Sequence, residues 1–144
     1  MAIFLDTGFF LALVHEKDPH HALAVTWLDR VRSGEWGHPY TSTLVMAEAA
    51  TLVTSRTRGN PVAIERMMQL FSGECRLAQL IRLTRDEEEK SWRLLMKIAS
   101  SGETVTKKGV VSYVDCTIIV ACQERNIERV ASFDEHFVPW LQYP

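Results

Sequence analysis

The chain has 144 residues, of which 47% are hydrophobic and 24% are charged, and its formal net charge is −2. This length and composition allow one domain with a substantial core. The near-neutral charge argues against a uniformly basic nucleic-acid-binding protein, so contact with a nucleic acid would need a local basic patch. No apolar run approaches the roughly 18 residues of a membrane-spanning helix, and the first residues lack the basic start of a signal peptide.

The cysteine pattern is typical of a cytoplasmic protein. Cys75, Cys116 and Cys122 are odd in number and form no CxxC pair. We therefore expect reduced, mostly buried thiols in a cytoplasmic protein that has no membrane segment.

Strand and helix patterns alternate along the chain. Short apolar stretches predict strands over residues 2–6, 37–42, 76–83 and 127–134. The segments between them predict helices over residues 7–16, 18–34, 43–57, 60–73, 84–102 and 112–126. Residues 103–111 are basic and predict a loop or a short strand pair. This alternation predicts a single α/β domain over residues 1–144, with a central parallel sheet of about four or five strands flanked by helices.

Several helix boundaries carry capping residues. Asp18 is expected to cap the helix over residues 18–34. Thr84 and Glu87 have the spacing of a capping box, and so do Ser112 and Asp115.

Four acidic residues interrupt or bound apolar stretches. Asp6 ends the first strand, Glu48 lies within an apolar helix, Asp115 lies near the start of another, and Asp134 ends the last strand. Each alone has a structural interpretation, as a cap, a solvated helix residue or a turn residue. All four in this order in one small α/β domain favour a shared site, because ligands of parallel sheets bind beyond the carboxyl ends of the strands.

Clustered carboxylates need compensation. An ionised carboxylate is costly in apolar surroundings, and neighbouring carboxylates raise one another's pKa values. A divalent cation removes this conflict, and Mg²⁺ and Mn²⁺ prefer oxygen ligands. Such a site suits phosphodiester hydrolysis, because a dication can activate water, orient the phosphate and stabilise the leaving oxygen.

Three stretches resemble one known family: "IFLDTGFFLAL", "TSTLVMAEAATLV" and "SYVDCTIIVACQERNIERVASFDEHF". They are similar to PIN-domain ribonucleases, and most similar to the toxins of VapBC-type toxin–antitoxin pairs. The pattern S-x-x-D-C, an apolar helix and a strand into F-D-x-H-F is the most specific part of the resemblance.

The resemblance implies a metal-dependent endoribonuclease. Its catalytic and metal-binding quartet would be Asp6, Glu48, Asp115 and Asp134 around Mg²⁺ or Mn²⁺, with Asp6 and Asp115 closest to the ion. It also implies an RNA substrate, a homodimer and a small antitoxin that blocks the site. Thr7 and Ser112 match hydroxyl positions that support the site in this family, whereas His136 is expected to be structural.

Other functions stay open at this point. The chain could be an RNA-maturation nuclease without an antitoxin, or a non-catalytic module of the same fold that binds RNA or protein. A phosphate-accepting switch is disfavoured because no second acid adjoins Asp6. The Asp-Thr-Gly of residues 6–8 also occurs in aspartic proteases, but those enzymes need two such aspartates on an all-β framework.

Basic residues flank the acidic segments. Arg56 and Arg58 follow the Glu48 helix, and Lys107 and Lys108 precede Asp115. They are either ordinary solvated charges or a phosphate-contacting rim around an acidic centre.

Overall fold

The computed structural model describes residues 1–106 and 109–144 and contains a parallel sheet of four strands in the order β3-β2-β1-β6. The strands are β1 (Ala2–Leu5), β2 (His38–Ser42), β3 (Gln79–Ile81) and β6 (Arg129–Ala131). The side chains of Ile3, Phe4 and Leu5 in β1 are fully buried. A strand covered on both faces needs a continuous apolar run, which explains the start of the sequence. The predicted fold class is confirmed.

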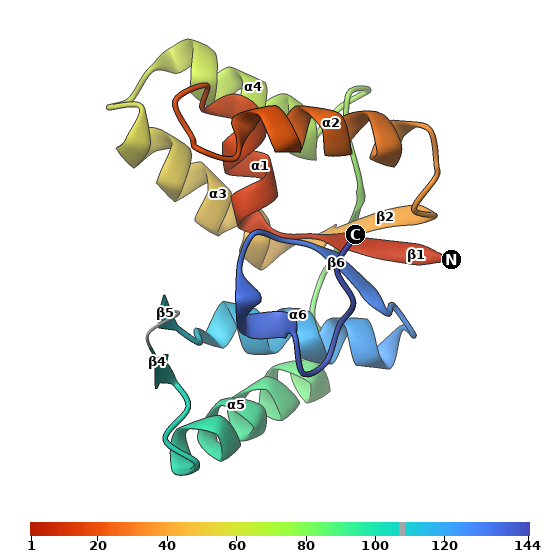
Figure 1. Cartoon of the computed structure of the whole chain (residues 1–144), viewed down its shortest axis with the longest axis vertical. Coiled ribbons are helices and arrows are strands. Elements are labelled where there is room, and N and C mark those ends of the chain that lie inside the picture. The colour runs from red at the N-terminus through yellow and green to blue at the C-terminus, as the bar shows by residue number, and fades with distance from the viewer. Residues whose placement is uncertain (107–108) are drawn as a thin grey trace.

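Helices cover both faces of this sheet (Figure 1). The helices on one face are α1 (Thr7–Val14), α2 (His21–Arg32), α3 (Thr43–Arg56) and α4 (Pro61–Phe71). The helices on the other face are α5 (Arg85–Ser100) and α6 (Tyr113–Glu124). The remaining elements are an antiparallel strand pair, β4 (Val105–Thr106) and β5 (Gly109–Val110), and a 3₁₀ turn, η1 (Glu135–Phe137).

The order of the strands creates a switch point between β1 and β6. The chain moves outward from β1 to β2 and β3 through α1–α4, and then crosses through α5 and α6 to β6, on the other side of β1. Ligands bind at such reversals, beyond the carboxyl ends of the strands. The register pairs Leu5 with Ala131, so the residues that follow β1 and β6 lie side by side.

A buried ion pair joins α5 to α6. Arg125 donates two hydrogen bonds, of 2.7 and 3.1 Å, to the two carboxylate oxygens of Glu87, which is 5% exposed. This contact corrects the predicted capping box at Thr84. The Thr84 hydroxyl accepts a hydrogen bond from the Glu87 amide at 3.1 Å, but the Glu87 carboxylate binds Arg125 instead of the Thr84 amide. A bidentate charged pair is stronger than a bond to a neutral amide.

Other boundaries also differ from the prediction: β3 covers only Gln79–Ile81 of the predicted residues 76–83. Asp18 does not cap α2: its carboxylate accepts a hydrogen bond from the His20 amide at 2.8 Å and closes a turn, and the helix begins at His21. Strand β6 ends at Ala131 instead of Asp134. The hydroxyl of Ser132 accepts a hydrogen bond from the Asp134 amide at 3.0 Å, and this bond turns the chain away from the sheet.

The thiols behave largely as predicted. Cys116 and Cys122 are buried and Cys75 is exposed, and all three are free. Burial raises the pKa of the Cys116 thiol to about 11 and also raises that of Cys122, so both stay protonated and unreactive at neutral pH.

Candidate active site

A pocket of about 710 Å³ lies at the carboxyl edge of the sheet. All four predicted acids line it: Asp6, Glu48, Asp115 and Asp134. Asp6 and Asp115 are buried, at 6% and 8% exposure, whereas Glu48 and Asp134 are half-buried. The fold therefore brings to one pocket four carboxylates that come from α3, from α6, from the residue after β1 and from the turn after β6.

Asp6 is held by two hydrogen bonds at the start of α1. Its Oδ1 accepts from the Thr7 amide at 2.7 Å, and its Oδ2 accepts from the Ser132 hydroxyl at 2.7 Å. Burial raises the pKa of Asp6 to about 7; the charges of Asp115 and Asp134 also raise it, while the two hydrogen bonds oppose the shift. Asp6 is thus fixed in place at an electrostatic cost.

Ser132 is a site residue that the sequence analysis missed. It is 2% exposed and its hydroxyl joins two of the acids, because it donates to Asp6 and accepts from the Asp134 amide. Its position directly after β6 matches the position of Asp6 directly after β1. The sequence carried no signal for this position, because the strand was expected to continue to Asp134.

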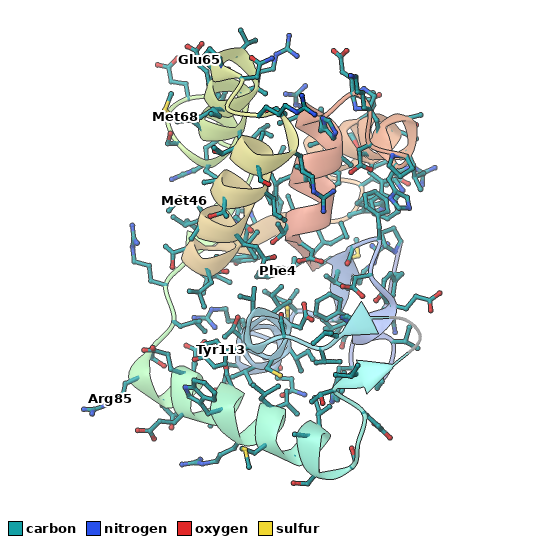
Figure 2. All side chains as sticks on the ribbon, turned by 90° about the vertical axis from the view of Figure 1, so that its left-hand side faces the viewer. Phe4, Met46, Glu65, Met68, Arg85 and Tyr113 are labelled. Carbon is teal, nitrogen blue, oxygen red and sulfur yellow. The ribbon has the colours of Figure 1, made fainter. Side chains whose placement is uncertain are left out.

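Asp115 is oriented by the first turn of α6. The Ser112 hydroxyl accepts from the Asp115 amide at 3.1 Å, and Asp115 Oδ2 accepts from the Ser112 amide at 2.9 Å. This is the predicted capping box, complete in both directions. In Figure 2 the N-terminal end of α6, marked by Tyr113, faces the viewer. Asp115 therefore caps α6 and lines the pocket at the same time.

His136 lies between two of the acids. Its Nδ1 is 3.1 Å from Asp115 Oδ2 and 3.0 Å from Asp134 Oδ1, and its side chain is 8% exposed. Suitable ligand atoms of these three residues all lie within 4.8 Å of one another. His136 therefore belongs to the pocket, although the sequence analysis gave it only a structural role.

The four carboxylates that line the pocket suit a hard divalent cation, and two of them, Asp115 and Asp134, belong with His136 to the group of close ligand atoms, whereas Asp6 and Glu48 lie outside that group. Carboxylate oxygens are the ligands that Mg²⁺ and Mn²⁺ prefer, and their mutual repulsion falls when a dication binds. The Thr7 hydroxyl lines the same pocket and is buried, and it has no hydrogen-bond partner within the described part of the chain. Such an orphaned buried oxygen is costly unless a ligand or a water satisfies it.

A basic side chain, that of Arg56 on α3, lines the acidic pocket. Glu48, Leu52 and Arg56 follow one another at intervals of four residues on α3, so they share one face, and all three line the pocket. Arg56 is the one arginine or lysine in the lining among the residues that the structure describes. The other residues of the predicted phosphate-contacting rim do not line this pocket among the described residues. Arg58 lines a neighbouring pocket, and Lys107 and Lys108 lie outside the described residues.

The fold and the sequence together define the family. The PIN domain family model matches residues 3–138, and the chain belongs to the PIN domain family. Its relation to VapBC-type toxins appears in the solved structures. VapC20 of Mycobacterium tuberculosis, described as a Sarcin-Ricin loop cleaving toxin, is 25% identical and superposes with a TM-score of 0.72 over 95% of this chain and 93% of its own.

A second solved structure shares the fold. VapBC2 from Rickettsia felis, bound to a DNA fragment from its promoter, is 11% identical, with a TM-score of 0.68 over 100% of this chain and 99% of its own. No curated protein matches the sequence. None of the described helices combines the length and apolar character that crossing a membrane requires.

Proposed function

We propose that this protein is a metal-dependent endoribonuclease and the toxin of a toxin–antitoxin pair. The observation that carries the proposal is the convergence of Asp6, Glu48, Asp115 and Asp134 in one pocket at the switch point of the sheet. Membership of the PIN domain family and the similarity to VapC20, a toxin that cleaves the Sarcin-Ricin loop, support RNA as the substrate.

The same four acids would hold Mg²⁺ or Mn²⁺. Asp6 and Asp115 are the more buried of the four acids and would lie closest to the ion. Glu48 and Asp134 would add negative charge around it. When bound, the ion supplies positive charge to the scissile phosphate and lowers the pKa of water.

The chain's own residues supply orientation. Ser132 and the Thr7 amide fix both oxygens of Asp6, and Ser112 fixes Asp115, so these carboxylates do not have to reorganise when substrate arrives. Without a cation, the Asp6 carboxyl keeps a proton below about pH 7 because it is buried beside other acids. We expect it to release that proton on binding the ion.

The proposed partners follow from the family relation. We propose that a small antitoxin inhibits this protein, since VapBC-type pairs combine a toxin with an antitoxin and the VapBC2 structure shares the fold. We also propose that the protein is a homodimer in the cytoplasm. An RNA-maturation nuclease without an antitoxin remains the second candidate. A reading frame for a small DNA-binding protein directly beside this gene favours the toxin.

RNA cleavage by the purified protein tests the proposal. Total RNA is incubated with the protein in Mg²⁺ or Mn²⁺, with and without EDTA, and the new RNA ends are sequenced. We expect discrete new ends that EDTA abolishes and excess Mg²⁺ restores. Cleavage that continues unchanged in EDTA, or intact RNA with either metal, would contradict the proposal.

A further inference from the structure

A second pocket, of about 680 Å³, continues from the acidic one and shares Arg56 with it. It lies between the end of α1, the end of α3 and the start of α4, which stack on the same face of the sheet in Figure 1. Its charged lining is mainly basic: Lys17, Arg56, Arg58 and Arg66, against the single acid Glu16 among the described residues. We call the pocket that these four cationic side chains line the basic groove.

The charges of the basic groove are mostly uncompensated. Among the described residues, no carboxylate oxygen lies within 4.0 Å of the charged nitrogens of Lys17, Arg56 or Arg58, and all three side chains are exposed. Arg66 and Glu16 approach to 3.8 Å, but both are more than half exposed. A row of unpaired cations repels itself and attracts a polyanion.

Arg58 lies directly after the C-cap residue of α3. Arg58 has φ of 54°, in the left-handed region, and is followed by Gly59 with φ of 74°. A left-handed residue after the C-cap is a common way for a helix to end, and Asn126 adopts the same conformation after α6, so this turn holds Arg58 at the end of α3.

The two pockets complement different parts of one ligand. The acidic pocket repels phosphates unless dications are present, whereas the adjoining groove attracts them without any ion. Arg56 stands at the junction, two helical turns along α3 from Glu48, which corresponds to about 12 Å. An RNA strand whose scissile phosphodiester lies among the four acids can therefore continue past Arg56 into the basic groove.

We propose that the basic groove binds the backbone phosphates of the RNA strand on one side of the cut. This inference rests on the proposed ribonuclease function and assigns the path of its substrate. Because phosphate contacts carry no sequence information, the groove fixes the position and direction of the strand and contributes affinity, while base selection must come from elsewhere.

The salt dependence of RNA binding tests the groove. Wild type and Arg56→Gln/Arg58→Gln are titrated into a labelled single-stranded RNA in EDTA, which prevents cleavage, over a series of salt concentrations. Each phosphate contact contributes about 0.7 to the slope of log K against log salt for single strands, so the double variant is expected to lose about 1.4 and to bind roughly tenfold more weakly.

Two matched variants isolate the effect. Arg32→Gln/Arg76→Gln removes the same charge from a different pocket, beside His38 at the start of β2, and is expected to keep the wild-type slope. Arg56→Lys/Arg58→Lys keeps the charge and is expected to restore the slope, which a purely structural role of the guanidinium groups would not allow. Thermal unfolding checks that each variant is folded.

The outcomes separate this inference from the proposed function. A wild-type slope in Arg56→Gln/Arg58→Gln, or an equal loss in Arg32→Gln/Arg76→Gln, overturns the groove even if the wild type cleaves RNA. Groove-dependent binding by a protein that never cleaves RNA supports the groove and overturns the nuclease. A wild type that neither binds nor cleaves RNA overturns both.

Discussion

Replacing Asp115 by asparagine is expected to reduce RNA cleavage by at least about 100-fold while the chain still folds. Residues that merely support a metal ligand cost about 10–100-fold when mutated, and Asp115 is proposed to touch the ion directly. Asparagine retains an oxygen that can accept the Ser112 amide hydrogen bond, now 2.9 Å long, so the start of α6 should persist. The cleavage rate in saturating Mn²⁺, together with the thermal unfolding temperature, measures both effects.

Asp86→Asn provides the matched control. Asp86 also lies in the first turn of a helix, α5, but it is exposed and outside the pocket. Its substitution removes the same charge from the first turn of a helix, so cleavage should stay at the wild-type rate. Full activity in Asp115→Asn would reject Asp115 as a metal-binding catalytic residue.

Replacing Asp6 by asparagine is expected to abolish activity and yet to stabilise the metal-free protein at neutral pH. Burial raises the pKa of Asp6 from 3.8 to about 7 in the folded chain. Between these values the folded state holds a proton that the unfolded state has lost, so the free energy of unfolding decreases as pH rises from about 4 to 7. Above about pH 7 the carboxyl is ionised in both states and the penalty is constant.

The rise of the Asp6 pKa from 3.8 to about 7 corresponds to a penalty on the order of 4 kcal/mol in the free energy of unfolding. Asparagine cannot ionise, so the unfolding temperature of Asp6→Asn relative to wild type should increase by several degrees between pH 4 and 7 in EDTA. Adding Mn²⁺ above pH 7 should stabilise wild type but not Asp6→Asn. An unfolding-temperature difference that stays constant with pH would contradict a destabilising Asp6 carboxylate, and Asp86→Asn serves again as the control.

The sequence predicted the large features of this fold because local patterns determine them. Alternating apolar strands and capped helices were sufficient for a four-stranded parallel sheet, and the rule for parallel sheets placed Asp6 near the site. The capping box of Ser112 and Asp115 is a contact over three residues, so spacing alone identified it. The proximity of the four acids was likewise predicted, while their catalytic role stays a prediction.

Contacts between distant segments could not be predicted in the same way. Ser132 reaches Asp6 only because the register pairs Leu5 with Ala131, and one sequence does not specify strand register between segments so far apart. His136 depends on the turn after β6, which ends that strand earlier than expected. The Glu87 carboxylate accepts hydrogen bonds from the Thr84 hydroxyl and from Arg125, at the end of α6, and not from the Thr84 amide that the capping box requires.

The central claim is that a divalent cation binds among the four acids. Calorimetric titration of Mn²⁺ into the metal-free wild type, Asp115→Asn and Asp86→Asn tests it without any substrate. We expect saturable binding to the wild type and to Asp86→Asn, and little or no binding to Asp115→Asn. Absence of binding to the wild type, or equal binding to all three proteins, would contradict the claim.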